Sequence, residues 1–428
     1  MILGIDLGST LFKATVFDHD LVPVGEGQAR VEYGPHGGNV VEMPVSETEN
    51  AFRATIAEAL RSAGVKDSEL ESIAIASQAQ TFTVRSSAGK ARVPFISWRD
   101  ARSQGSCRAA DTLTDFAEHC SVDQCIPLLM VSKLAWLQDQ FNGSLVDEND
   151  LVLMLPTWFV QRLTGTAVVD SNLAAMSGLY SMQTGGWWKD ALHVCGIRQC
   201  NLPALAELGC VSGLTTRDAQ RYGLPPGIPV VLAGNDQTAG AYGANIHEQD
   251  AMLITLGTAQ VVYVVCKSIP APAPGVLRGP YPGGRGYQLV ADAHGAGTVH
   301  WARTVLKSCA SKVDFENAAD CAAADCSGIR FIADGPAGSG RWINETPQTN
   351  EADKARAVLL CLVDRMAEML NRLQPFESEK RMFITGGGSN SDVWLECLQQ
   401  RLGKTLYRLQ DASPALGAAR MARKHTHG

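Results

Sequence analysis

Two turns that lie far apart in this chain combine a glycine with hydroxyl side chains in a way that suits anion binding. The first is Gly8-Ser9-Thr10 and the second is Gly257-Thr258. Each lies between two apolar runs, so each is expected to be the turn of a β-hairpin. Glycine lets backbone N–H groups approach an anion closely, and the hydroxyls add donors that point the same way. Two such turns facing each other predict a grip on a polyphosphate from both sides.

Two further glycine-marked turns follow strands that the sequence predicts. The strand fed by residues 224–228 ends in Gly234-Asn-Asp-Gln237, which places Asp236 at the tip of a buried strand. The strand expected at 382–385 runs into a triple glycine, 386–388, and a helix follows. Such a turn offers bare backbone to an anion or a flat ring. Taken singly, each turn has an ordinary structural alternative.

The common signatures of nucleotide loops do not occur in the sequence. It contains no G-x-x-x-x-G-K-[ST] loop and no strand-linked G-x-G-x-x-G. If the protein handles ATP, the glycine-marked turns must bind it.

The segments that must hold these turns alternate between strands and helices, which predicts an α/β fold. A helix is expected over residues 46–63, with Ser46 as its N-cap and acidic side chains in its first turn. A buried strand is expected over 73–77, and helical apolar spacing predicts a core helix over 352–373. Residues 270–286 are rich in proline and glycine, which predicts an extended loop and no folding unit.

The length and composition of the chain indicate a globular protein of two domains. Its 428 residues suit two domains of roughly 200 residues each. We place the boundary within 245–250, which gives domains over 1–245 and 246–428. Hydrophobic residues make up 45% and charged residues 19%, which argues against disorder.

Charge and hydropathy exclude several classes of partner. The net charge is −7 and no Lys/Arg run occurs, so nucleic acid is not expected as a partner. No apolar stretch approaches the roughly 20 residues that span a bilayer, and the chain enters a strand at once, without a signal peptide. A cytoplasmic location and a small-molecule substrate are therefore expected, and a homodimer is left open.

The twelve cysteines include three pairs with four residues between their members. These pairs are Cys120/Cys125, Cys195/Cys200 and Cys321/Cys326, and no C-x-x-C occurs. Reduced, buried thiols are expected, with metal binding or disulfides as the alternative.

In this order and spacing, the glycine-marked turns and further segments resemble the FGGY family of carbohydrate kinases, within the actin-like/hexokinase superfamily. The resemblance spans essentially the whole chain, as that of a compact, divergent member. The further matching segments are Ile96-Ser-Trp98-Arg-Asp100-Ala-Arg102 (I-x-W-x-D-x-R), Lys133-Leu-Ala-Trp136-Leu137 (K-x-x-W-L), Leu163-Thr-Gly165 with Asp170 and Ala174, Gly297 with Trp301, Ser391 with Trp394, and Ala415-Leu-Gly-Ala-Ala419.

The resemblance implies two ribonuclease-H-like (actin-like ATPase) domains with a cleft between them. It also implies ATP and Mg²⁺ as cofactors. Asp236 would be the general base that takes the proton of a sugar hydroxyl, the alternative being a turn carboxylate that caps the next helix. Asp6 would hold Mg²⁺, the alternative being a structural hydrogen bond. The residues implied in nucleotide binding are Gly8, Ser9, Thr10, Lys13, Gly257, Thr258, Gly297, Gly386, Gly387, Gly388 and Asn390.

The sugar site that the resemblance implies draws on two segments of the first domain and on the base region. Its expected residues are Ala79, Gln80, Trp98, Asp100, Arg102 and Gln237. Core packing is the alternative for Trp98, and a structural ion pair is the alternative for Asp100 and Arg102.

The chain departs from the family pattern in several places. The second turn reads Gly257-Thr-Ala259 where the family commonly has G-T-S, which removes one hydroxyl donor. The family's Glu-Gly near Leu360 and its Asp near Gln400 are missing, and the segment 340–347 is shortened. Position 80 is Gln, where xylulokinase-like members tend to have His and glycerol-kinase-like members Glu.

Since the first turn and Asp236 are intact, we expect an ATP-dependent kinase that phosphorylates a primary hydroxyl of a small ketose or polyol. A ketopentose such as xylulose or ribulose is favoured by family frequency alone. The alternatives are a catalytically weak sugar-binding or regulatory protein on the same fold, and a chaperone-like or structural ATPase of the wider superfamily.

Overall fold

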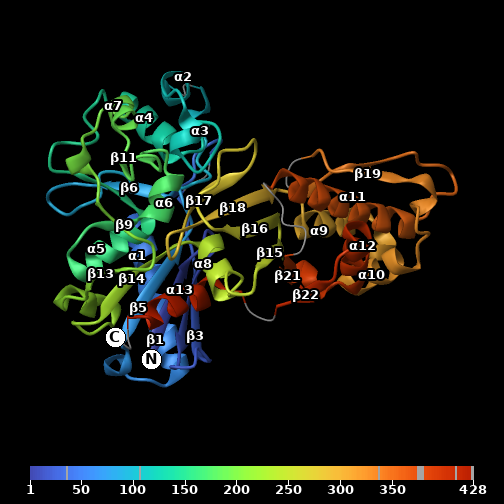
Figure 1. Cartoon of the computed structure of the whole chain (residues 1–428), viewed down its shortest axis with the longest axis horizontal. Coiled ribbons are helices and arrows are strands. Elements are labelled where there is room, and N and C mark those ends of the chain that lie inside the picture. The colour runs from blue at the N-terminus through green and yellow to red at the C-terminus, as the bar shows by residue number, and fades with distance from the viewer. Residues whose placement is uncertain (35–36, 106–107, 336–337, 374–379, 410–411, 426–428) are drawn as a thin grey trace.

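The computed structural model describes residues 1–34, 37–105, 108–335, 338–373, 380–409 and 412–425. Two six-stranded sheets dominate this part of the chain, one in each half of the molecule (Figure 1). Helices pack on the faces of both sheets, as the predicted α/β class requires.

The first sheet has the order β13-β14-β5-β1-β2-β3. Its strands are β1 (Ile2–Leu7), β2 (Leu11–Phe17), β3 (Pro23–Arg30), β5 (Ser72–Ser77), β13 (Val211–Leu214) and β14 (Pro229–Asn235). β1, β5 and β14 run parallel, so their carboxyl ends meet at one edge, where Ser77 pairs with both Leu7 and Asn235. The predicted hairpin at Gly8 and the predicted strands before Ser77 and Asp236 are confirmed.

The second sheet has the order β17-β18-β16-β15-β21-β22. Its strands are β15 (Ala251–Leu256), β16 (Gln260–Cys266), β17 (Leu277–Tyr281), β18 (Arg285–Asp292), β21 (Arg381–Thr385) and β22 (Leu406–Arg408). An antiparallel trio (β15, β16, β18) and two parallel strands (β21, β22) repeat the plan of the first sheet. Both halves therefore have the predicted ribonuclease-H-like core, and the hairpin at Gly257 is confirmed.

A four-stranded sheet and three two-stranded pairs complete the β-structure in the described ranges. The first is β4 (Glu42–Met43), β7 (Phe95–Ile96), β6 (Phe82–Arg85) and β8 (Leu151–Met154). The pairs are β10 (Tyr180–Ser181) with β11 (Gly186–Trp187), β9 (Val168–Asp170) with β12 (Ala204–Ala206), and β19 (Arg330–Ile332) with β20 (Arg341–Ile343).

The helices of the described residues are α1 (Val45–Ala63), α2 (Arg108–Thr112), α3 (Phe116–His119), α4 (Met130–Gln140), α5 (Leu155–Thr164), α6 (Ser171–Met176), α7 (Lys189–Val194), α8 (Asp236–Gly243), α9 (Ala296–Val305), α10 (Lys312–Cys321), α11 (Glu351–Arg372), α12 (Asp392–Leu402) and α13 (Pro414–Arg423). α11 confirms the helix predicted over 352–373. Within the described ranges, no helix combines the length and the apolar character needed to cross a bilayer.

The start of α1 corrects one prediction. The helix begins at Val45, with Pro44 as its N-cap and no side-chain cap hydrogen bond. The φ of −59° at Pro44 already suits a helix entry, and its carbonyl accepts the N–H and the hydroxyl of Thr48. Ser46 therefore lies inside the first turn and is not the cap.

The proline- and glycine-rich segment also differs from its prediction. In place of a loop, β17 and β18 form an antiparallel hairpin, in which Pro280 pairs with Gly286. β17 is the edge strand of its sheet, and proline is tolerated there because one side of an edge strand has no ladder partner. The prediction of a loop was therefore wrong for residues 277–281 and 285–286, whereas residues 270–276 lie outside the named strands, as predicted.

One hydrophobic core joins the two sheets. Its buried residues come from the first sheet (Ile2, Phe17), from the second sheet (Leu253, Phe383), and from α8 and α13. In Figure 1, α13 lies beside α8 and the strands of the first sheet, although it follows the second sheet in the chain. The helix packs very closely there: a Cβ at Gly417 would lie 1.7 Å from the carbonyl oxygen of Ala239 in α8.

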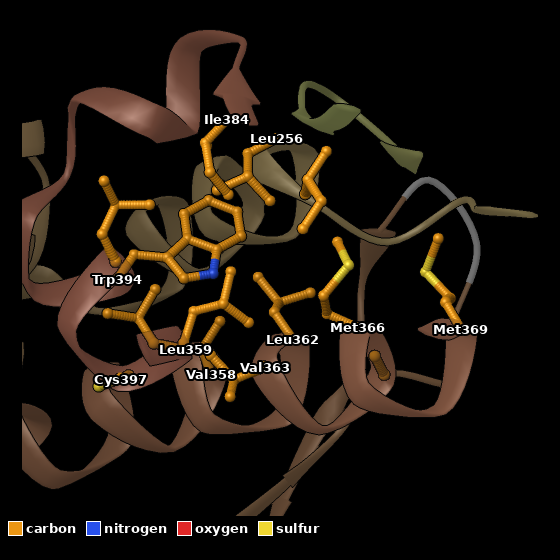
Figure 2. Packing of buried hydrophobic residues seen from close by; sticks show 14 of the residues in the cluster. Leu256, Val358, Leu359, Leu362, Val363, Met366, Met369, Ile384, Trp394 and Cys397 are labelled. Atoms are coloured by element: carbon orange, nitrogen blue, oxygen red, sulfur yellow. The ribbon is translucent and has the colours of Figure 1, made fainter. Parts of the chain in front are cut away.

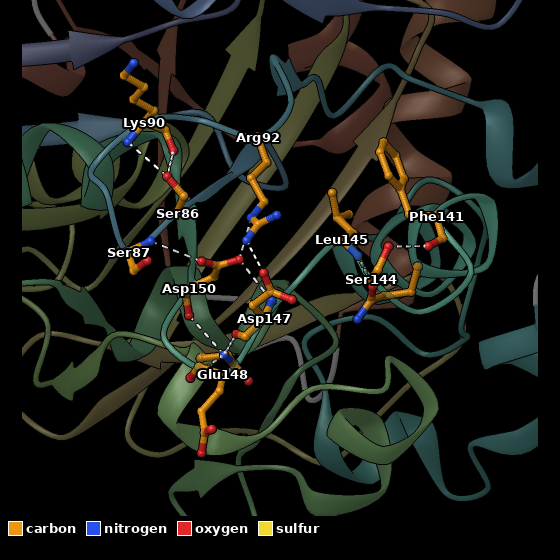
Figure 3. A network of polar contacts seen from close by, with 12 residues as sticks. Ser86, Ser87, Lys90, Arg92, Phe141, Ser144, Leu145, Asp147, Glu148 and Asp150 are labelled. Atoms are coloured by element: carbon orange, nitrogen blue, oxygen red, sulfur yellow. Dashed lines mark hydrogen bonds and ion pairs between the residues drawn. The ribbon is translucent and has the colours of Figure 1, made fainter.

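A buried polar network fixes the outer part of the first half (Figure 3). The carboxylate of Asp150 is almost fully buried; it accepts the N–H groups of Ser87 and Asp147 and pairs with Arg92. Burial acts to raise the pKa of Asp150, but these hydrogen bonds and the guanidinium outweigh it and lower that pKa. The network ties the β6–β7 connection to the segment before β8.

Candidate active site

The first phosphate turn lies between β1 and β2. A Cβ at Gly8 would lie 2.8 Å from the carbonyl oxygen of Leu11, so the turn has no room for a side chain at this position. The carbonyl of Ser9 accepts the hydroxyl of Tyr33 at 2.6 Å, and the side chain of Thr10 is exposed. The turn therefore presents a fixed backbone and an exposed hydroxyl.

Asp6 lies on β1, opposite Lys13 in the register of β1 and β2. Its Oδ1 is buried and accepts no hydrogen bond from the residues that the structure describes. Burial and the nearby charge of Asp236 raise the pKa of Asp6 to about 7, against the opposing effect of Lys13. A pocket of about 510 Å³ reaches both Asp6 and Lys13, and residues 413–415, at the start of α13, form part of its wall.

Asp236 is the first residue of α8, directly after β14. Asn235 is the N-cap, and its side-chain oxygen accepts the N–H of Gln237 at 3.0 Å. Asp236 Oδ1 accepts the same N–H at 2.8 Å. Burial raises the pKa of Asp236 to about 6, although that hydrogen bond acts in the opposite direction. The predicted alternative, a carboxylate at the helix start, is thus present geometrically, but the capping is shared with Asn235.

Asn172, which was not predicted from the sequence, binds the backbone just before Asp236. Its Oδ1 accepts the N–H of Asn235 at 2.9 Å. Its Nδ2 donates to the hydroxyl of Thr238 at 3.1 Å and to the carbonyl of Pro280 at 2.9 Å. Asn172 therefore connects α6, the start of α8 and the β17 edge of the second sheet. Its closeness to Asp170, a residue of the family pattern, was the available signal.

The second phosphate turn is braced by the start of α9. The carbonyl of Gly257 accepts the N–H of Ala296 at 2.7 Å, and the carbonyl of Thr258 accepts the N–H of Gly297 at 3.2 Å. A Cβ at Gly295 would lie 2.7 Å from the Gly257 oxygen. Thr258 is exposed and Ala259 is half-buried, so one hydroxyl of this turn faces outward. Gly297 thus lies against this turn, and its role in nucleotide binding stays a prediction.

The triple glycine follows β21 and opens a short 3₁₀ helix, η8 (Gly387–Asn390), before α12. Gly386 has φ of 90°, and a Cβ there would lie 2.7 Å from the carbonyl oxygen of Leu256. A Cβ at Gly388 would lie 2.6 Å from the Trp394 ring, which packs on Leu256 and Ile384 in the core (Figure 2). Gly387 and Asn390 are exposed. The turn thus lies against the end of β15, which leads into the second phosphate turn.

Five of the six predicted sugar residues lie on the segments after β5 and β7, and Gln237 lies in α8. Trp98 is 41% exposed, so the alternative of core packing is excluded. Asp100 is buried and accepts from Arg102 Nε at 3.0 Å, and Arg102 also pairs with Glu42 at 2.6 Å. The structural ion pair named as an alternative is therefore present; a role of either residue toward a sugar stays a prediction.

Ala79 and Gln80 are half-buried, and the side chain of Gln80 is already engaged. Gln80 has φ of 65°; its Oε1 accepts the N–H of Met130 at 2.7 Å, and its Nε2 donates to the carbonyl of Met176. Contact of Gln80 with a sugar stays a prediction, and in this arrangement its amide also fixes the turn.

Family models match both halves of the chain. The N-terminal domain of the FGGY family of carbohydrate kinases matches residues 1–243, and its C-terminal domain matches residues 252–424. The chain belongs to the FGGY family. By this membership it is a carbohydrate kinase, and the expected family and fold class are confirmed.

Curated relatives of this FGGY kinase include two kinds of enzyme. It is 26% identical to the xylulose kinase of Klebsiella pneumoniae, over 100% of this chain and 90% of that protein. It is also 26% identical to the glycerol kinase of Deinococcus radiodurans, over 98% of this chain and 88% of that protein. Sequence similarity alone thus does not choose between the two acceptors.

Solved structures show the same fold. The ligand-bound xylulose kinase of Lactobacillus acidophilus matches with a TM-score of 0.88 at 19% identity, covering 99% of this chain and 89% of that one. The glycerol kinase of Plasmodium falciparum, solved with ADP, matches with a TM-score of 0.85 at 16% identity, covering 98% and 88%.

Proposed function

We propose that this FGGY kinase transfers the γ-phosphate of ATP to a primary hydroxyl of a small ketose or polyol. The observation that carries the proposal is the position of Asp236, a carboxylate of raised pKa at the carboxyl edge of the first sheet, electrostatically coupled to Asp6. A base near neutrality at the end of a strand is suited to accept a proton from an attacking hydroxyl. Gln237, beside it, would contact the acceptor.

The residues present fit a divalent cation near Asp6. The Oδ1 atom is a hard oxygen ligand that is buried without a donor in the described part of the chain, and an orphan of this kind needs a partner. Asp6 would hold Mg²⁺ directly or through water. When bound, Mg²⁺ would neutralise charge on the phosphoryl oxygens.

The chain's own groups would orient the nucleotide. Thr10 and Lys13 of the first hairpin and Thr258 of the second are exposed donors for phosphate oxygens, together with the backbone at Gly8, Ser9 and Gly257. The turn at 386–388, in which Gly387 is exposed, and the exposed Asn390 would lie along the adenosine, and Gly297 would lie beside the second turn. In this proposal, residues 1–245 hold the acceptor, the first turn and the base, and residues 246–428 bind the nucleotide.

A ketopentose such as xylulose or ribulose is the acceptor we favour, and xylulose kinases among both the sequence relatives and the solved neighbours support it. The exposed Trp98 ring offers a face on which a sugar can stack. Glycerol is the main competitor, because glycerol kinases are equally similar in sequence.

A coupled assay of ADP release across D-xylulose, D-ribulose, L-ribulose and glycerol tests the function. We expect turnover to depend on one of these acceptors. Binding of a sugar without acceptor-stimulated turnover would instead support the catalytically weak sugar-binding protein, which Ala259 in the second turn favours because it lacks a hydroxyl donor.

Asp236→Asn tests the base. It keeps the shape of the side chain but cannot accept the proton, so turnover should fall by about 10²-fold or more while ATP affinity changes little. The matched control is Asp392→Asn, since Asp392 is also the first residue of a helix but is largely exposed. Native-like turnover in Asp236→Asn would eliminate Asp236 as the base.

A further inference from the structure

Three hydrogen bonds in series link the first phosphate turn to Trp98. Gln78 Nε2 donates to the carbonyl of Gly8 at 3.1 Å. The hydroxyl of Thr81 donates to Gln78 Oε1 at 3.1 Å and accepts the backbone N–H of Trp98 at 3.1 Å. Gly8 lies in the first phosphate turn and Trp98 lies in the segment after β7. We call Gln78 and Thr81 the relay, because these two side chains connect the two segments through hydrogen bonds.

The direction of every bond in the relay is fixed. The Gly8 carbonyl can only accept, so Gln78 must turn its amide nitrogen toward Gly8 and its oxygen toward Thr81. The Thr81 hydroxyl therefore donates to Gln78, and it accepts from Trp98 because a backbone N–H can only donate. Gln78 is 5% and Thr81 1% exposed, so no water can readily replace a lost partner.

The backbone around the relay is held as a unit. The N–H of Gln78 donates to the carbonyl of Leu7 at 3.0 Å, next to the phosphate turn. On the other side, the buried amine of Lys133 donates to the carbonyls of Ser97 at 2.8 Å and Gln80 at 3.3 Å. The segment after β5 and the segment after β7 therefore cannot shift independently without breaking buried hydrogen bonds.

We propose that Gln78 and Thr81 are positioning residues that couple occupancy of the first phosphate turn to the placement of Trp98. A phosphate bound to the turn fixes the peptide at Gly8, and its carbonyl then fixes Gln78, Thr81 and the Trp98 backbone in series. The inference rests on the proposed function for its ligand, a nucleotide at the first turn. It extends that function by connecting the nucleotide to Trp98, one of the expected sugar-binding residues.

Hydrogen–deuterium exchange of the full chain, with and without MgADP, tests the coupling. In the native chain, MgADP should slow exchange in the peptide that contains Trp98 by about fivefold or more. Thr81→Val and Gln78→Met remove the relay with little change in shape, and the slowing should disappear in both. Thr81→Ser keeps the hydroxyl and should restore it.

Thr83→Val is the matched control. Thr83 is also buried, and its hydroxyl donates to the carbonyl of Val93 at 2.6 Å, outside the relay. This variant loses a comparable hydrogen bond, so it should be destabilised to a similar degree, but it should keep the response of Trp98 to MgADP.

The outcomes separate the two proposals. If MgADP binds, as a rise in melting temperature reports, but exchange at Trp98 does not respond in the native chain, the relay is overturned and the kinase proposal stands. An equal response in Thr81→Val overturns the relay too. If MgADP does not bind at all, the nucleotide assignment of the first turn fails, and the relay fails with it.

Discussion

In the proposed reaction, the two carboxylates of Asp6 and Asp236 carry most of the chemistry that single residues contribute. Burial raises the pKa of both, to about 7 and about 6. At neutral pH such a carboxylate is ionised in about half of the molecules for Asp6 and in most of them for Asp236, and it is a stronger base than an exposed aspartate. These ionised carboxylates lower the free energy of unfolding, because the fold holds their charges in poorly solvated positions.

The pKa of Asp236 predicts an acid limb in the rate profile. Only the ionised carboxylate can accept the proton, so kcat/KM should fall about tenfold per pH unit below about pH 6. Initial rates at subsaturating acceptor between pH 4.5 and 8 measure this. Asp392→Asn should show the same limb as the native chain, whereas a flat profile in folded protein would contradict the assignment.

The same pKa predicts that Asp236→Asn stabilises the fold at pH 8. The folded-state pKa is raised, so the native state is penalised above that pKa and the penalty disappears as pH falls below the unfolded value. The rise of the Asp236 pKa from 3.8 to about 6 corresponds to about 3 kcal/mol, and the partial exposure of the side chain reduces the expected gain to about 2 kcal/mol. Chemical denaturation of both chains at pH 8 and pH 4 measures the difference, which should shrink to a small fraction at pH 4, close to the unfolded pKa of 3.8. A loss of stability at pH 8 would contradict it.

Among single residues, the sequence located the glycine-marked turns, Asp6 and Asp236, because these turns and carboxylates lie at or next to the ends of recognisable apolar strands. It did not locate Gln78, Thr81 or Asn172. A buried amide or hydroxyl follows no spacing rule, and its partners lie in segments distant in the chain. Such residues become visible only when the strands are brought together.

Among the elements, the contact between α8 and α13 is the one that most directly supports the site. α8 begins with Asp236, and α13 packs along it and against β1, where a Cβ at Gly4 would lie 2.2 Å from the carbonyl oxygen of Ala415. Small residues of α8 and α13 allow this close packing, but the sequence could not say which surfaces would meet. The β17–β18 hairpin escaped prediction for a related reason, since the strand character of an edge depends on its neighbour.

Gly417→Ala should separate these two helices. Its Cβ would clash with the Ala239 backbone at 1.7 Å, so we expect a loss of about 3 kcal/mol or more in unfolding free energy, with reduced turnover because the start of α8 shifts. Gly186→Ala is the control, because its Cβ would meet only the Thr184 hydroxyl, at 4.0 Å. Denaturant titration of both variants decides; equal stabilities would contradict the packing argument.

Over the whole molecule, the two halves share a hydrophobic core and are not independent domains joined by a linker. Residues of both sheets pack with α8 and α13 in one cluster. The β17 edge also reaches the first half, where Arg278 Nη2 donates to the carbonyl of Ala117 at 2.6 Å. The predicted boundary within 245–250 therefore separates the strands of the two sheets. Two contacts cross it: the shared core around α8 and α13, and the hydrogen bond from Arg278 to Ala117.

This sharing predicts how fragments behave. Residues 1–245 alone lack the helix that covers one face of their sheet, so we expect no cooperative thermal transition from them. A fusion that adds residues 412–425 through a flexible linker should restore a transition, followed by circular dichroism. A fusion that adds α12, which packs in the other half, is the control. Cooperative unfolding of residues 1–245 without α13 would contradict the shared core.

The position of α13 also has a consequence for biosynthesis. Domains usually fold as units while the chain is being made, the N-terminal one first. Here the ribosome must translate the whole second sheet before α13 exists to cover the first. The strands of the first sheet can thus pair early, but one apolar face of that sheet stays exposed to solvent until α13 has been synthesised. We expect chaperones to bind at this stage.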